Sequence, residues 1–181
     1  MKPAVLVISL LLHGWPTYFQ RQPDVVIERL EQRVFERIND ERVRRKLPPL
    51  NPDSRLSAIA RGHSKDMAAK GYIAHVNKEG LDPTQRAQAA GYKCSRVIGR
   101  VVYSGVAENI FQNNLYGRKT VRGAQIVYEW NNEEKIAASS VKGWMESSGH
   151  RANILSSVYA ATGIGVAIAQ DYRVYITQQF C

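Results

Sequence analysis

The sequence has little cysteine, no long hydrophobic run and none of the short motifs of several common catalytic centres. Two cysteines among 181 residues exclude a disulfide-dense mini-protein and a zinc module built on cysteine. The most apolar stretch, residues 4–12, is shorter than the ~20 residues that a membrane-spanning helix needs. GxSxG, HExxH and P-loop motifs are absent, which excludes the hydrolases, metalloproteases and nucleotide-binding proteins that depend on them.

What the sequence does contain is the composition of one folded domain with excess positive charge. Hydrophobic residues make up 44% and charged residues 23%, and 181 residues suffice for a single core. The net charge of +9 favours anionic neighbours such as lipid or wall polymers. No motif combines aromatic and basic residues in the manner of nucleic-acid-binding proteins, so we expect no nucleic-acid partner, and we expect a monomer.

Residues 1–22 predict a secretory signal or an N-terminal anchor. Lys2 precedes the apolar run, and His13, Gly14 and Pro16 end it. No A-x-A cleavage pattern follows, so an uncleaved anchor or a buried N-terminal element are alternatives. Export would place the protein outside the cell or at the cell surface, with residues 23–181 forming its single domain.

Three helices are expected, over residues 23–47, 51–71 and 133–147. Pro23 suits the first position of a helix, Asn51 suits an N-cap, and Gly149 suits a C-cap. Apolar residues recur at helical spacing in each segment. In the second segment this stripe includes His63, which we therefore interpret as a hydrogen-bonded core histidine.

Two strands are expected at the C-terminal end, over residues 161–169 and 174–180. Both are rich in β-branched residues, and Asp171 between them suits a hairpin turn. Shorter strand segments are expected near residues 101–110 and 124–130. Helices that flank a small antiparallel sheet predict an α+β sandwich.

Three polar side chains are candidates for a site. His75 and His150 each follow the end of an expected helix, and sites commonly form at such loop entrances. Glu108 lies in an apolar, strand-like run, where a buried carboxylate needs polar partners. Two histidines and a carboxylate are ligands that suit zinc, but their separation along the chain carries no information.

Residues 144–155, WMESSGHRANIL, resemble the signature of the CAP superfamily, which contains SCP-like extracellular proteins, cysteine-rich secretory proteins and pathogenesis-related proteins. Further similar segments follow the order of that family: ARGHSKDM at residues 60–67, AENI at 107–110 and GIG at 163–165. The similarity covers about residues 25–181, and the compact prokaryotic form of the family is most similar.

The resemblance implies a three-layer α-β-α sandwich with a central cleft, lined by two histidines and two glutamates and able to hold a divalent metal. By motif the histidines fall on His75 and His150, and the first glutamate falls on Glu108. Eukaryotic members have the second glutamate where this chain has Ser147. Glu146, one residue earlier and about 100° away around a helix, is the cleft-lining candidate.

Two neutral histidines leave zinc half coordinated, so water or a ligand must complete the site. The leading interpretation is therefore an exported, non-enzymatic CAP domain whose cleft binds a lipid, small molecule or partner and holds a divalent cation, zinc foremost. A peptidase-like, metal-assisted hydrolase with Glu108 as proton acceptor is the alternative, although Glu108 could equally orient a histidine.

Charge-driven attachment to an anionic cell-surface polymer is a third interpretation. Seven basic residues lie between Arg29 and Lys46. Acidic residues alternate with them, so a salt-bridged, solvated helix face explains the same pattern.

Cys94 and Cys181 are expected to form a disulfide. Export implies an oxidising compartment, and two cysteines allow one pairing. Cys181 follows the last expected strand, whose end would otherwise fray. The alternative is two unrelated thiols, one buried and one terminal.

Overall fold

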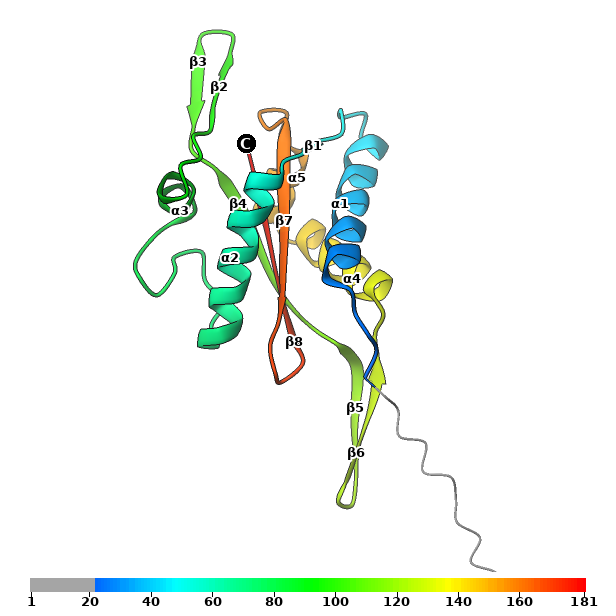
Figure 1. Cartoon of the computed structure of the whole chain (residues 1–181). Helices are drawn as coiled ribbons and strands as arrows, with labels where there is room; N and C mark the ends of the chain where they lie inside the picture. Colours follow the sequence, from blue (N-terminus) through cyan, green and yellow to red (C-terminus); the bar gives the residue numbers. More distant parts are fainter. Residues whose placement is uncertain (1–21) are drawn as a thin grey trace, which may run out of the picture.

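The computed structural model describes residues 22–181, so the expected leader lies, but for its last residue, outside the described residues. The helices of this part are α1 (Ile27–Arg44), α2 (Ser54–Lys70), α3 (Pro83–Ala89), α4 (Glu133–Glu146) and α5 (Ser148–Leu155). Figure 1 shows α2 on one side of a central sheet and α1 and α4 on the other, which is the expected α-β-α sandwich. None of these helices has the length and apolar character that crossing a membrane requires.

The central sheet has four strands in the order β1-β7-β8-β4. These are β1 (Asn51–Pro52), β7 (Ala161–Ile168), β8 (Arg173–Phe180) and β4 (Ala107–Asn114). The β7, β8 and β4 strands pair antiparallel, whereas β1 pairs parallel with β7, so the sheet is mixed and not purely antiparallel as expected. Alternation along β8 turns Val174 and Ile176 to the core beneath α1 and α4, and Thr177 to α2.

Two glycines of β7 allow α2 to pack directly on the sheet. A Cβ at Gly163 would lie 2.2 Å from the backbone nitrogen of Ser57, and one at Gly165 would lie 2.0 Å from that of Arg61. No side chain fits at either position. The GIG segment is therefore explained by the close approach of helix and strand.

Buried apolar residues of α1 and α4 form the main core with the sheet. Leu30, Val34 and Ile38 of α1 are fully buried, as the helical spacing predicts. Trp144 of α4 is also buried, and its indole nitrogen donates to the carbonyl of Ile110 at 3.0 Å. This bond fixes α4 over β4, next to the strand position that carries Glu108.

Several helix boundaries differ from the sequence-based expectation. α1 begins at Ile27 and not at residue 23, because the amide of Val26 donates to the carboxylate of Glu133 in place of an earlier helical turn. Asn51 does not cap α2. Its amide pairs with the carbonyl of Ala160, and Asp53 caps the helix by accepting from two backbone amides.

Two short helices were not expected. α3 has a capping box between Asp82 and Gln85, with Pro83 at its first position. α5 starts directly after the cap residue of α4, so Gly149 lies inside a helix and is not the expected C-cap. His150 therefore lies in the first turn of α5 rather than in a loop.

Two hairpins extend from the sandwich, at opposite ends of the molecule in Figure 1. One consists of β2 (Ser95–Ile98) and β3 (Val101–Ser104), and the other of β5 (Tyr116–Arg122) and β6 (Gln125–Trp130). The expected strand over 101–110 is thus split into β3 and β4 near Gly105, whose φ of 87° requires glycine.

The expected disulfide joins Cys94 to Cys181, with the two Cα atoms 5.6 Å apart. It attaches the end of β8 to the segment that leads into β2. The C-terminal residue is held further by backbone hydrogen bonds to Ala160 and Ala161. The disulfide therefore adds a cross-link from the base of the β2–β3 hairpin to β8, besides the backbone that runs from β3 into β4.

Candidate functional site

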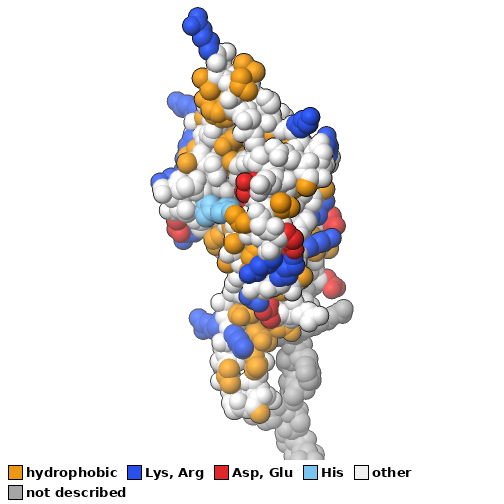
Figure 2. Space-filling view, turned by 90° about the vertical axis from the view of Figure 1, so that its left-hand side faces the viewer, with side chains coloured by type: hydrophobic (Ala, Val, Ile, Leu, Met, Phe, Trp, Pro, Cys, Tyr) orange, Lys and Arg blue, Asp and Glu red, His pale blue; other side chains and the backbone are white. Residues whose placement is uncertain are grey.

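The candidate site lies at β4, the edge strand of the central sheet, where two layers of the fold meet. Successive residues of a strand point to opposite faces, so Glu108 faces α2 and α3 whereas Asn109 faces α5. The loop after α2 supplies His75, and α5 supplies His150. Figure 2 shows histidine side chains together on one face of the molecule.

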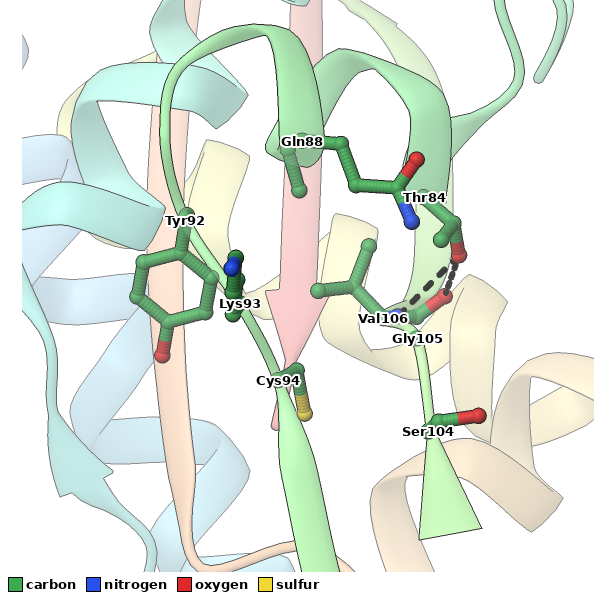
Figure 3. A pocket seen from close by; sticks show the side chains of 9 residues that line it. Thr84, Gln88, Tyr92, Lys93, Cys94, Ser104, Gly105 and Val106 are labelled. Carbon is green, nitrogen blue, oxygen red and sulfur yellow. Dashed lines mark hydrogen bonds between the residues drawn. The ribbon is translucent and has the colours of Figure 1, made fainter.

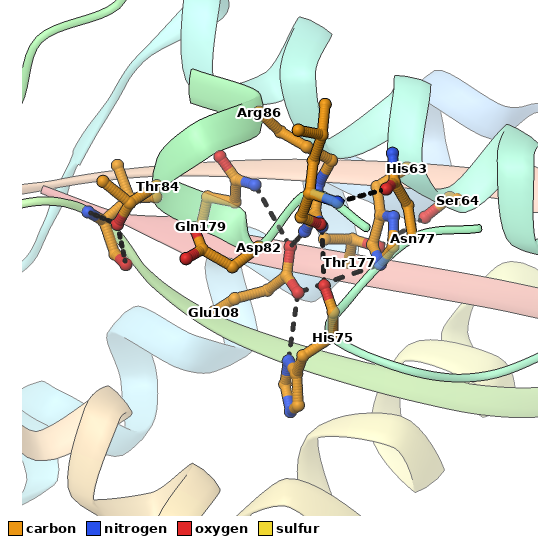
Figure 4. A network of polar contacts seen from close by, with 12 residues as sticks. His63, Ser64, His75, Asn77, Asp82, Thr84, Arg86, Glu108, Thr177 and Gln179 are labelled. Carbon is orange, nitrogen blue, oxygen red and sulfur yellow. Dashed lines mark hydrogen bonds and ion pairs between the residues drawn. The ribbon is translucent and has the colours of Figure 1, made fainter. Parts of the chain in front are cut away.

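The carboxylate of Glu108 is the centre of a buried polar network, drawn in Figure 4. Its Oε1 accepts from Nδ1 of His75 at 3.0 Å. Its Oε2 accepts from a guanidinium nitrogen of Arg86, with which it forms an ion pair, and from Nε2 of Gln179 at 3.1 Å. The side chain is 1% exposed, so these partners replace the water that an ionised carboxylate would otherwise require.

The network keeps Glu108 ionised. Burial raises the pKa of this carboxyl, but the hydrogen bond from His75 and the charge of Arg86 outweigh burial, and the pKa lies below its ordinary value. An ionised carboxylate is a hydrogen-bond acceptor only. Of the two neutral tautomers of His75, Glu108 therefore favours the one that carries its proton on Nδ1, in which Nε2 is the acceptor.

Arg86 connects the network to the backbone that carries His75. Besides its ion pair, it donates to the carbonyl of His75 at 2.6 Å and to that of Leu81 at 2.9 Å. One guanidinium thus holds both the carboxylate and the loop of the histidine that the carboxylate orients. The loop after α2 is fixed at this point although His75 itself is 47% exposed.

His75 and His150 face each other across the edge of the sheet. Their ring centroids are 6.4 Å apart and the ring planes meet at 49°. The carbonyl of His150 accepts from Nδ2 of Asn109 at 3.1 Å, which positions the first turn of α5 on β4. Burial lowers the pKa of His150, and the charge of His75 lowers it further, so the imidazole is neutral at pH 7.

These two imidazoles fit a divalent cation only as an open site. Neutral nitrogen is the donor that zinc accepts from histidine, at about 2.0–2.1 Å, and rings 6.4 Å apart stand near the outer limit for sharing one ion. The carboxylate oxygens of Glu108 already accept hydrogen bonds from His75, Arg86 and Gln179. In the described part of the chain, no group of three or more His, Cys, Asp or Glu side chains could hold a metal.

The structure does not bring Glu146 to the two histidines. Its side chain is 66% exposed, 3.7 Å from Nζ of Lys142, and it lines a groove between α4 and α1 with residues such as Arg37. The cause is the helical rotation of about 100° per residue, which turns position 146 away from β4. Ser147, the position that the eukaryotic pattern uses, ends the helix.

His63 is a buried histidine, as its place in the apolar stripe predicted. Its Nε2 donates to the carbonyl of Ala74 at 2.9 Å, next to His75, and lies 3.8 Å from Glu108. Burial lowers the pKa of His63 and outweighs the opposite effect of the Glu108 charge. His63 thus supports the loop of His75 as an uncharged donor.

Sequence reasoning missed Arg86, Gln179 and Asn153, which orient the candidate residues. Asn153 donates to the carbonyl of Glu108 and to Asn109. A buried carboxylate in a strand required some cation or amide near it, and that requirement was the one available signal. That requirement did not identify the partners, because they lie far from Glu108 in the sequence, in α3, β8 and α5.

The arginines of α1, and Arg45 directly after it, are mostly engaged in ion pairs. Arg29 and Arg37 contact carboxylates of α4, Arg33 contacts Glu36, and Arg44 and Arg45 contact Glu41. Arg42 is buried and donates to three backbone carbonyls. This pattern is the salt-bridged helix face, so α1 presents little unbalanced positive charge.

A small cavity lies beside the disulfide and not at the histidines. Its volume is about 150 Å³, and Thr84, Tyr92, Cys94 and Val106 are among the residues that line it (Figure 3). Pockets for drug-sized ligands are about 300–1,000 Å³. The side chain of His75 is instead 47% exposed at the surface of the domain.

Comparison with known proteins identifies the family. The sequence profile described as the cysteine-rich secretory protein family, CAP, matches residues 35–180. The chain belongs to the CAP family. The fold agrees: an extracellular SCP-domain protein from Bacillus anthracis aligns with a TM-score of 0.62 and 24% identity over 85% of this CAP chain and 40% of that one.

Two curated relatives are from Bacillus subtilis. The uncharacterized protein YkwD is 33% identical and the uncharacterized membrane protein YlbC is 29% identical, each over 83% of this chain. The CAP chain spans 46% and 34% of their respective lengths. These relatives are thus membrane or uncharacterised proteins, and the structural relative is extracellular.

A more distant structure, that of NaASP2 with Zn²⁺, aligns with a TM-score of 0.48 and 16% identity. This likeness is too remote to carry a metal site to the present chain.

Proposed function

We propose that this chain is an exported CAP-domain binding protein, acting as a monomer at the cell surface or outside the cell. Its surface at His75 and His150 binds a small molecule, lipid or partner, and the two imidazoles hold a divalent cation, zinc foremost. The observation that carries the proposal is the pair of facing rings, 6.4 Å apart, one of which is oriented by a buried carboxylate.

The tautomer that the contact with Glu108 favours for His75 and the lowered pKa of His150 support this proposal. In the neutral tautomer of His75 that the acceptor Glu108 favours, the proton is on Nδ1 and Nε2 can bind a cation. His150 is neutral at pH 7 because burial lowers its pKa. A histidine that binds a metal has to be deprotonated at the ligating nitrogen, and the lowered pKa of His150 favours that state.

The donor set supports a binding site more than a catalytic one. Catalytic zinc sites normally have three protein ligands, and two imidazoles leave most positions to water or ligand. A bound ion would supply charge and open coordination positions for an anionic or carbonyl group. Glu108 would also have to accept a proton to act as a general base, but three donors occupy its oxygens and its pKa is lowered.

Calorimetric titration of the full chain with Zn²⁺, without a histidine tag, tests this function. We expect one weak site per chain, with His75→Gln and His150→Gln each weakening binding by at least about tenfold, since outer partners of ligands alone account for 10–100-fold. Glu146→Gln is the matched control and should leave the affinity unchanged. Zinc binding that is equally strong in both histidine variants would refute the site.

A chelator provides a second test. An open site with two histidines contributes far less than the ~10 kcal/mol or more of closed structural zinc sites. We therefore expect EDTA to lower the melting temperature only slightly. Unfolding of the chain by chelator would mean that the metal is structural, and the binding function proposed here would be wrong.

A further inference from the structure

The tip of the β2–β3 hairpin exposes apolar side chains that nothing in the described part of the chain covers. Val97 is 70% exposed, Val102 62% and Val101 53%, and Ile98 and Tyr103 are exposed as well. Figure 1 shows the hairpin extending beyond the sandwich, and Figure 2 shows hydrophobic side chains gathered at that end. Two-stranded hairpins are marginal in water, so an uncovered apolar tip indicates a partner.

The register of the hairpin places apolar residues on both of its faces. Val97 pairs with Val102, and Ile98 pairs with Val101. Adjacent pairs point to opposite faces, so the last two pairs before the turn are apolar on either side. A protein that docks on a flat ribbon covers one face, whereas a surrounding apolar medium covers both.

The charge of this segment has one sign. Lys93, Arg96 and Arg100 lie between residues 93 and 107, and no Asp or Glu occurs in that range. Arg100 is in the turn itself, next to Gly99, whose φ of 61° allows the tight reversal. Exposed apolar residues with cations and without carboxylates complement an anionic lipid surface.

We infer that the β2–β3 hairpin docks the protein on an anionic lipid bilayer, with its tip inserted into the interfacial region. Two apolar pairs and the turn correspond to roughly 7–10 Å at ~3.3 Å per residue, which matches the ~5–10 Å that interfacial elements penetrate. The next pair, Arg96 with Tyr103, would then lie at headgroup level. This surface is separate from the histidine site and does not depend on the proposed function.

The β5–β6 hairpin serves as an internal control. It also exposes Val121, Ile126 and Val127. Its end is polar, because Arg122 pairs with Gln125 beside the turn, and Glu129 contributes a carboxylate opposite Arg118. The apolar residues therefore lie behind a polar tip, so the inference predicts binding through β2–β3 and not through β5–β6.

Vesicle sedimentation with the full chain tests the inference, using phosphatidylcholine vesicles with and without 30% phosphatidylglycerol. One variant carries Val97→Thr, Val101→Thr and Val102→Thr, and the matched control carries Val121→Thr, Ile126→Thr and Val127→Thr. Threonine retains the high β propensity of valine and isoleucine. The N-terminal segment is the same in the wild type and both variants, so differences in vesicle binding come from the hairpins. We expect the first variant to lower the partition coefficient on anionic vesicles at least about tenfold, and the control to change it less than twofold.

A single-charge variant measures the electrostatic part. Arg100→Gln should weaken binding about fivefold at low salt and less at high salt, in line with the contribution of one cation near an anionic surface. Equal binding of wild type and the β2–β3 variant, or equal losses in both hairpin variants, would overturn the inference. So would self-association of the wild type in solution that the β2–β3 variant abolishes, because the tip would then be a protein interface.

Discussion

The Glu108 network and the β2–β3 hairpin depart from the usual distribution of polar and apolar groups in opposite directions. Glu108 is a carboxylate with a side chain 1% exposed, and its oxygens are satisfied by His75, Arg86 and Gln179. Val97 is a valine that is 70% exposed and has no covering element in the described structure. The buried carboxylate has polar partners inside the fold, whereas the exposed valine has no apolar partner in the described structure.

The difference shows which surface can change without loss of the fold. A buried charge costs several kcal/mol when a partner is lost, so every member of the network depends on the others. Exposed side chains on a hairpin have no such dependence, because water already contacts them. Substitutions in the Glu108 network should therefore lower the stability of the fold, whereas substitutions at the hairpin tip can alter binding with little effect on stability.

The largest expected effect is the loss of Arg86. Arg86→Met removes the cation beside a buried carboxylate and three donors to Glu108 and to the backbone around His75. We expect the free energy of unfolding to fall by about 3–5 kcal/mol in urea denaturation, the range for breaking a buried ion pair by removing one partner.

A double variant separates charge from packing in this prediction. Adding Glu108→Gln to Arg86→Met removes the uncompensated charge, so stability should return part of the way to the wild type. Arg100→Met, in the exposed turn, is the matched control and should change stability by less than about 0.5 kcal/mol. If Arg86→Met is as mild as this control, the network does not stabilise the fold.

The disulfide cross-links the hairpin base to the end of β8, next to Gln179 of the Glu108 network. Replacing Cys94 and Cys181 with alanine removes a bridge of sequence separation 87 between the hairpin base and the end of β8. We expect a loss of about 2–4 kcal/mol in the free energy of unfolding, because long loops gain most conformational entropy when released. Reduced wild-type protein should melt at the same temperature as the variant. A variant as stable as the oxidised protein would show that the bridge is dispensable.

Much of the fold could be predicted from local patterns. Glu133–Glu146 agrees with the expected third helix almost to the residue, and the strands Ala161–Ile168 and Arg173–Phe180 agree within a few positions. These elements carry strong periodicity and clear ends. The boundary at Asn51 failed because a parallel pairing with Ala161, over a hundred residues away, outweighed its capping preference.

The candidate site also contains residues that could be predicted from the sequence and residues that could not. The resemblance to the CAP superfamily pointed to His75, His150 and Glu108, which lie together in the structure. Arg86 and Gln179 could not be inferred, since a buried partner is fixed by tertiary packing and leaves no periodic signal. The short helix α3 does have a sequence signal, because Asp82 and Gln85 have the spacing of a capping box.

The pH dependence of stability tests the network through its histidines. Burial lowers the folded-state pKa of His63 and of His150 below the ordinary value of 6.5. The unfolded chain therefore binds more protons below pH 6.5, and stability should decrease as the pH falls from 7 through the folded-state pKa values. The lowered pKa of Glu108 adds a further loss at lower pH, below the ordinary pKa of a glutamate.

Urea denaturation between pH 8 and pH 4, with EDTA present, measures this dependence. His63→Gln should flatten the part of the curve that begins near pH 6.5, whatever its effect on absolute stability. The β5–β6 variant should retain the wild-type slope, since it changes no titrating group. An increase in stability on acidification would contradict the assignment of both histidines as neutral.

The smallest expected effect concerns the hairpin tip and completes the comparison. Val97→Thr exchanges a methyl for a hydroxyl at a position that water already reaches, so the free energy of unfolding should change by less than about 0.5 kcal/mol. The same exchange at the fully buried Val166 places an unsatisfied hydroxyl in the core and should cost about 1–3 kcal/mol. A large loss at Val97 in urea denaturation would mean that the hairpin packs on the domain and is not available to a membrane.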